Sequence, residues 1–108
     1  MPKAIVVHDG ENGLAELIET DTELETLQRA VGGLIEAVDL GEVVLVMDEE
    51  GKLREKALNA RATLYLYNVI SPTRSSDFMV GTVVIFGGRG GDDLADVPQS
   101  AIEYFDLV

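Results

Sequence analysis

The sequence contains no cysteine and only one histidine among its 108 residues. The lack of cysteine excludes disulfide bonds, thiolate metal ligands and cysteine nucleophiles. One histidine is too few for a histidine-based metal site. No run of ~18 apolar residues is present, so no membrane-spanning helix is expected. These absences leave a globular chain for which we expect no metal and no cofactor.

The N-terminal stretch MPKAIVV lacks the basic start and the long apolar segment of a signal peptide. We therefore expect a cytoplasmic protein, in the host cytoplasm if it is phage-encoded. The length of 108 residues predicts one domain over residues 1–108, large enough to bury a single modest core.

Basic residues are also scarce, since 8 of them face 20 acidic residues and the net charge is −12. Residues 1–50 carry 13 acidic and 2 basic side chains, whereas residues 51–91 carry 2 acidic and 6 basic ones. Such a field repels phosphates and anionic lipid surfaces, so direct nucleic-acid or membrane binding is disfavoured. Solubility is the simplest interpretation of the charge. The alternatives are an acidic face for a basic partner, or homo-oligomers joined through opposite patches.

The pattern of apolar residues and turn formers predicts an α+β fold with a mainly antiparallel sheet of about five strands. Residues 59–68 alternate well enough to form a strand as well, so a helix there competes with a strand. Strands are expected at residues 3–8, 14–19, 34–40, 43–48 and 78–86, and helices near 23–31, 59–68 and 98–105.

Two short signals bound the first helix. Thr22 and Glu25 match the S/T-x-x-E capping box, in which each side chain satisfies an otherwise unpaired backbone amide. Gly32-Gly33 then ends the helix, because glycine adopts the left-handed conformation that a helix C-cap requires.

The next stretch predicts a hairpin whose register can be derived. Gly41-Glu42 fits a two-residue turn with glycine first. Glu36 then lies in the middle of the more apolar face of the hairpin, where an ionised carboxylate needs a partner or water. The expected cross-strand pairs are Leu40 with Val43, Val38 with Leu45, and Glu36 with Met47.

The best candidate site combines Glu36 with the basic segment that follows the hairpin. A small anionic ligand, such as a nucleotide, is the class that these side chains suit. The competing interpretations are a structural ion pair or a solvent-exposed carboxylate for Glu36, and charge balance for the basic segment. The candidate ligand-binding residues are Glu36, Lys52, Arg54, Asn59, Arg61 and Thr63.

Other chemistry finds less support, and no catalytic residue is assigned. The spacing of Asp48, Glu49 and Glu50 is not that of a calcium loop, so a solvated turn is expected. His8 has no recognisable Ser-His-Asp arrangement around it.

The glycine-rich run 87–91 matches neither common phosphate-loop pattern, so a flexible connector is expected. A loop is expected at residues 71–77, where Pro72 excludes a regular element.

Several motifs, taken in order, resemble a family of small uncharacterised domains found in actinobacteria, firmicutes and their phages and mobile elements. The resemblance implies no activity, but it favours a phage or mobile-element accessory protein. The matching pieces are Leu27-Gln28, Val31-Gly32-Gly33, Ile35-Glu36, Asp48 to Leu53, Asn59, Ala62-Thr63, Asp77 and Val80-Gly81.

Two hypotheses follow from these features. The first is a non-enzymatic accessory protein that binds a host or phage protein through an acidic surface, with DNA mimicry as a specific form. The second is a binding module for a small anionic ligand. An enzyme that uses Glu36 as an acid or base has the least support, because no catalytic spacing accompanies it.

Overall fold

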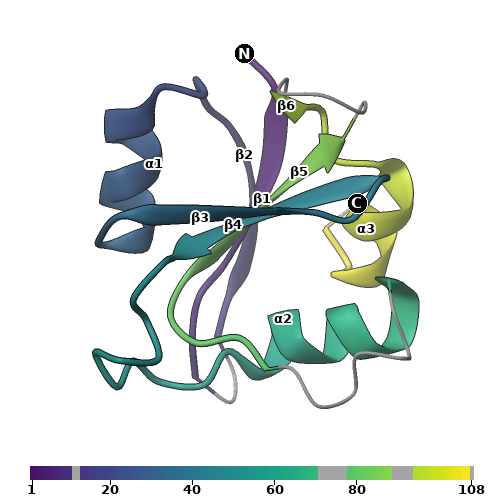
Figure 1. The fold of residues 1–108 in the computed structure, drawn as a ribbon. Helices are drawn as coiled ribbons and strands as arrows, with labels where there is room; N and C mark the ends of the chain where they lie inside the picture. The colour runs from purple at the N-terminus through teal and green to yellow at the C-terminus, as the bar shows by residue number, and fades with distance from the viewer. Residues whose placement is uncertain (11–12, 71–77, 89–93, 108) are drawn as a thin grey trace.

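A six-stranded antiparallel sheet runs through the middle of the molecule, in the order β2-β1-β5-β4-β3, with β6 paired to β5 (Figure 1). The computed structural model describes residues 1–10, 13–70, 78–88 and 94–107. The predicted α+β fold is confirmed. The strands are β1 (Lys3–Val7), β2 (Ala15–Glu19), β3 (Ile35–Asp39), β4 (Val43–Asp48), β5 (Val83–Gly88) and β6 (Leu94–Ala95).

Helices cover both faces of this sheet, which makes three layers (Figure 1). The helix α1 (Leu24–Val31) lies over one face, where Leu27 and Val31 join Val44, Val46 and Phe86 in one core cluster. The helices α2 (Ala60–Tyr65) and α3 (Gln99–Tyr104) pack on the other face, and a π-helical turn, η1 (Leu66–Ile70), continues α2. Residues 59–68 are therefore helical, and the competing strand is wrong.

The start of α1 differs from the prediction, and its end agrees with it. The capping box of Thr22 and Glu25 is wrong, because α1 begins at Leu24 and its N-cap residue makes no side-chain capping bond. Asp21 instead accepts the backbone N–H of Glu23 at 2.9 Å. A hydrogen bond from Thr26 adds to this contact, and together they lower the pKa of Asp21. Gly32 ends the helix as predicted, with φ at +79°.

The predicted register of the β3–β4 hairpin is confirmed. Glu36 pairs with Met47 and Val38 with Leu45, while the N–H of Leu40 donates to the carbonyl of Val43 at 2.9 Å. Gly41 has φ at +90°, which explains why the turn requires glycine first. The face of β3 that carries Glu36 is thus the one that the sequence indicates.

The strand predicted at 78–86 begins later, at Val83, and ends later, at Gly88. Residues before it are held by the chain that precedes α2, since Asn59 N donates to Met79 O and Gly81 N donates to Ala57 O, both at 2.8 Å. Gly81 then turns with φ at +71°, which interrupts a regular strand. Gly87 and Gly88 belong to β5 and pair with β6, so the expected flexible connector is wrong for these two glycines.

The loop expected at residues 71–77 and the remainder of the glycine-rich run, from residue 89 onward, lie outside the described residues. In the parts of the chain that the structure covers, no helix is long and apolar enough to cross a membrane.

Candidate functional site

Glu36 borders a hollow of about 240 Å³ between the β3–β4 hairpin and the helical layer. A smaller hollow of about 160 Å³ adjoins it and extends toward Glu49 and Val80. We name the two together the β3 groove. The residues that line the larger hollow are Glu36, Val38, Leu40, Leu45, Met47, Lys52, Leu66, Phe78 and Met79.

The β3 groove is apolar at its floor and charged at its rim. Leu45, Leu66 and Met79 are buried beneath it. Lys52 lies at the rim with its ammonium nitrogen 4.2 Å from the centre of the Phe78 ring, a cation–π contact. Glu36 is exposed to solvent, so its carboxylate keeps its hydration and needs no buried partner. This arrangement matches the exposed-carboxylate interpretation of Glu36.

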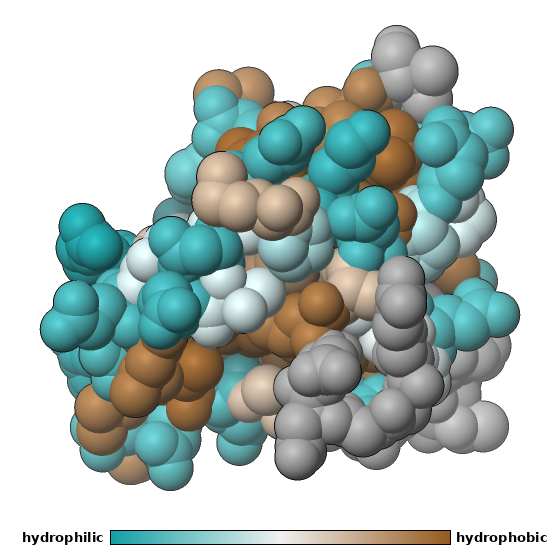
Figure 2. Space-filling model, turned by 90° about the horizontal axis from the view of Figure 1, so that it is seen from above, coloured by the Kyte–Doolittle hydropathy of each residue, from teal (hydrophilic) through white to brown (hydrophobic). Residues whose placement is uncertain are grey.

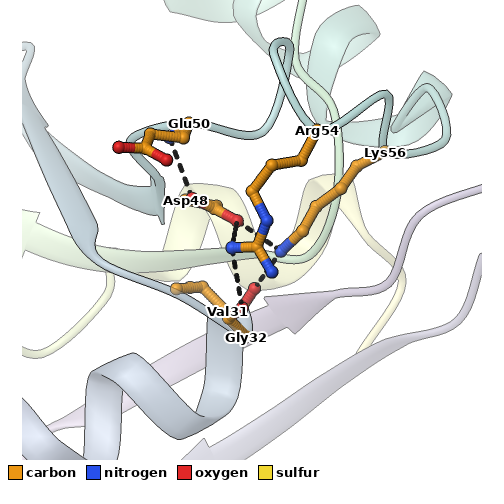
Figure 3. A network of polar contacts seen from close by, with 6 residues as sticks. All are labelled: Val31, Gly32, Asp48, Glu50, Arg54 and Lys56. Carbon is orange, nitrogen blue, oxygen red and sulfur yellow. Dashed lines mark hydrogen bonds and ion pairs between the residues drawn. The ribbon is translucent and has the colours of Figure 1, made fainter.

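Asp48 is the acidic residue that the fold does bury. Its side chain is 1% exposed and forms ion pairs with Lys56 at 2.5 Å and Arg54 at 3.0 Å (Figure 3). The backbone N–H of Glu50 also donates to it at 2.9 Å. The hydrogen bond from Lys56 is the largest cause that holds the pKa of Asp48 below its usual value, and it outweighs the opposite effect of burial. The expected solvated turn is therefore wrong for Asp48, because the basic residues fold back onto it.

The same two basic side chains close the end of α1. Lys56 Nζ donates to the carbonyl of Val31 at 2.7 Å, and Arg54 Nη1 donates to the carbonyl of Gly32 at 3.2 Å (Figure 3). The last carbonyls of a helix lack partners within the helix and carry partial negative charge. These contacts join the end of β4 to the end of α1. The role of Asp48, Arg54 and Lys56 is therefore structural.

The polar atoms of Asn59 and Thr63 also form hydrogen bonds within the protein. Asn59 is fully buried, and its amide nitrogen donates to Val7 O at 2.8 Å and Gly81 O at 2.9 Å. Its side-chain oxygen accepts the N–H of Ala62 at 3.0 Å, which caps α2. The hydroxyl of Thr63 accepts the N–H of Met79 at 2.9 Å.

Arg61 points away from the β3 groove. Its guanidinium donates to the carbonyl of Gly13 at 3.1 Å and lies 5.4 Å from the centre of the Phe105 ring. Of the six candidate ligand residues, Glu36 and Lys52 come together in one cavity of the described part of the chain. The aromatic ring of Phe78 and the side chains of Leu66 and Met79 complete it, and no local motif in the sequence points to them.

Most acidic side chains in the described ranges lie on the surface. In these ranges Asp48 forms ion pairs with Arg54 and Lys56, and Glu16 lies 3.0 Å from the His8 ring, a contact that is an ion pair only when the histidine is protonated. No group of three or more acidic or histidine residues in these ranges is arranged to hold a metal ion. Figure 2 shows one face, on which hydrophilic residues predominate and divide the hydrophobic ones into separate areas. The surface of the described residues therefore carries mainly negative charge, and few of its carboxylates are paired with a basic side chain.

Comparison with known proteins gives a family and no activity. Residues 2–108 match the family described as "Domain of unknown function (DUF3846)". No curated protein and no solved structure matches the chain.

Proposed function

The chain belongs to the DUF3846 family, and we propose that it is a non-enzymatic accessory protein that binds a basic protein partner through its acidic surface. A phage or mobile element is the setting in which we place it, and the cytoplasm is its compartment. Mimicry of DNA toward a nucleic-acid-binding protein is the most specific form of this role.

The observation that carries the proposal is how the fold uses its basic residues. Arg54, Lys56 and Arg61 are engaged with backbone carbonyls or with Asp48, and Lys52 lies on Phe78. The described acidic residues other than Asp48 and the partly buried Asp21 are exposed, so the negative field of the chain acts on the solvent. Such a field speeds encounter with positively charged partners and weakens as salt is added.

A pull-down from host lysate at ~0.05 M and ~0.5 M salt tests the proposal, because salt screens exposed charges over this range. The bait is the wild-type chain, compared with the variant Glu36→Gln/Glu42→Gln/Glu49→Gln. We expect a basic protein that is retained at low salt, released at high salt and retained less by the variant. If no basic protein is retained, or if its retention does not change with salt, binding through the acidic surface is wrong. Displacement of the partner by duplex DNA would support mimicry.

Binding of a small ligand in the β3 groove is the second candidate, since Glu36 and Lys52 do meet there. The larger hollow of the groove is lined by one acidic and one basic side chain above an apolar floor, which suits a small zwitterion better than a nucleotide. Its volume of about 240 Å³ is below the ~300–1,000 Å³ that is usual for ligand pockets. A thermal-shift screen of nucleotides and amino acids against wild type and Lys52→Ala distinguishes this candidate. A shift that disappears in Lys52→Ala would support it, and no shift with any compound would exclude it for these classes.

A further inference from the structure

β3 ends the sheet, and its outer backbone edge has no strand partner among the described residues. On its inner edge, Leu34 O accepts the N–H of Glu49 at 2.8 Å, and Leu40 N donates to Val43 O at 2.9 Å. Backbone groups of an antiparallel strand alternate between its two edges. The N–H and C=O groups of Ile35, Ala37 and Asp39 therefore point outward, away from β4.

The β3 groove lies on one face of the hairpin whose outer strand is β3. Glu36, Val38 and Leu40 are alternate residues of the hairpin that line it on one face of the sheet. A strand that pairs with β3 places every second side chain on that same face. The outer edge thus offers main-chain hydrogen bonds, and the groove offers room for alternate side chains, which are the two components of binding by strand addition.

Charge decides which occupant this edge suits. The exposed residues along and beside it include Glu36, Asp39, Glu42 and Glu49. Two copies of the chain would bring two edges of this kind together, each from a molecule with a net charge of −12. Like charges on neighbouring strands destabilise the pairing, and opposite charges stabilise it. An extended segment of a basic protein therefore fits the edge better than a second copy does.

We propose that β3 binds an extended segment of its protein partner, with alternating basic and apolar residues, as an added strand. Outward backbone groups of Ala37 pair with the segment, and its apolar side chains enter the β3 groove. Its basic side chains then lie on the opposite face beside the exposed Asp39, and Glu36 adds to the negative field along the edge. This inference rests on the proposed function and names the element that carries it.

Proline substitution tests the edge itself. Ala37→Pro removes an outward N–H and leaves the ladder to β4 in place, since proline is tolerated where the N–H faces solvent. The matched control is Ala15→Pro on β2, the opposite end of the sheet. There His8 N donates to Leu14 O, so the N–H of Ala15 also faces outward. The probe is a fluorescent peptide of alternating lysine and valine, with a peptide of the same composition in two blocks as its control.

Fluorescence anisotropy should show that wild type binds the alternating peptide more tightly than the blocked one. Ala37→Pro should weaken binding about tenfold, and Ala15→Pro should change it by less than about twofold. A second pair of variants guards against a failure of Ala37→Pro to fold. Glu36→Lys should weaken binding, whereas Glu19→Lys, an exposed glutamate on the same face of β2, should weaken it less.

The outcomes separate this inference from the proposed function. If both proline variants bind like wild type while salt still releases the peptide, the acidic surface binds but strand addition at β3 is wrong. If Ala15→Pro alone weakens binding, β2 is the binding edge and the inference is also wrong. A wild-type dimer that Ala37→Pro dissociates, measured by analytical ultracentrifugation, would assign the edge to a second copy and overturn the proposal.

Discussion

Asp48 shows how one buried residue can determine what several candidate site residues do. It holds Arg54 and Lys56 over the end of α1, and both its oxygens accept hydrogen bonds. Hydrogen bonds to charged groups stabilise by about 1.5–3 kcal/mol each. We expect Asp48→Asn to lower the free energy of unfolding by about 2 kcal/mol at neutral pH, measured by urea denaturation. Glu49→Gln is the control, because Glu49 is exposed and its side chain forms no ion pair in the described ranges.

The same residue predicts a pH dependence. Because the pKa of Asp48 is lower in the folded protein than in the unfolded chain, its stabilising effect is complete above the unfolded pKa of about 4. That effect is lost as the pH falls through the folded-state pKa. The stability difference between wild type and Asp48→Asn should therefore shrink below about pH 4. A difference that stays constant down to strongly acidic pH would show that Asp48 does not act through its charge.

Asn59 is predicted to be a structural residue of the same importance. Its side chain joins β1, the start of α2 and the chain at Gly81 through three hydrogen bonds, all inside the protein. Asn59→Ala removes the cap of α2 and the side-chain donor to two buried carbonyls, so we expect a loss of about 3 kcal/mol. Asn68→Ala is the control, because Asn68 is exposed and, among the described residues, its side chain donates to the hydroxyl of Tyr104 at 3.3 Å. Equal effects of the two substitutions on thermal unfolding would contradict this assignment.

Among the elements, the register of the β3–β4 hairpin was predictable, because its signals are local, although β3 (Ile35–Asp39) is shorter than the strand expected at 34–40. Side chains of a strand alternate with a period of two, and a two-residue turn fixes which residues face each other. The capping of α1 was less certain, since Asp21 and Thr22 both precede the helix and both are good capping residues. The extent of β5 depended on contacts of Met79 and Gly81 with the distant segment before α2, which no local pattern reveals.

The candidate site was predictable only where it lies on the hairpin. Glu36 was placed correctly because the register was correct. The direction of Arg54, Lys56 and Arg61 could not be predicted, since each forms its contacts with residues at least six positions away, and Arg61 reaches back to Gly13. Spacing alone suggested a cluster of basic residues, whereas the tertiary contacts separate them.

The hairpin turn gives a prediction at this scale. Gly41 has φ at +90°, and a Cβ added there would meet nothing within 4 Å. Gly41→Ala should therefore cost only backbone strain, about 1–2 kcal/mol. Glu42→Ala, in the same turn and exposed, should change stability by less than about 0.5 kcal/mol. Chemical denaturation of the two variants checks this, and a Gly41→Ala chain as stable as wild type would show that the turn does not depend on glycine.

At the scale of the whole molecule, the net charge of −12 affects folding as well as binding. Exposed carboxylates repel one another in the folded chain, and only a small number are neutralised by described ion pairs. Salt screens this repulsion, so the folded state should become more stable as salt is added. From ~0.01 M to ~0.5 M sodium chloride, we expect a rise of a few degrees in Tm, measured by circular dichroism.

Added salt should therefore stabilise the folded chain and weaken binding of a basic partner. These opposite effects distinguish the influence of the negative charge on folding from its influence on binding. The variant Glu36→Gln/Glu42→Gln/Glu49→Gln should show a smaller rise of Tm with salt and a weaker salt dependence of binding, because the same exposed carboxylates cause both effects. If salt stabilises the chain while partner binding is unaffected by salt, the negative charge serves solubility alone. In that case the acidic surface would lose its role in recognition, and the apolar floor of the β3 groove would have to account for any partner.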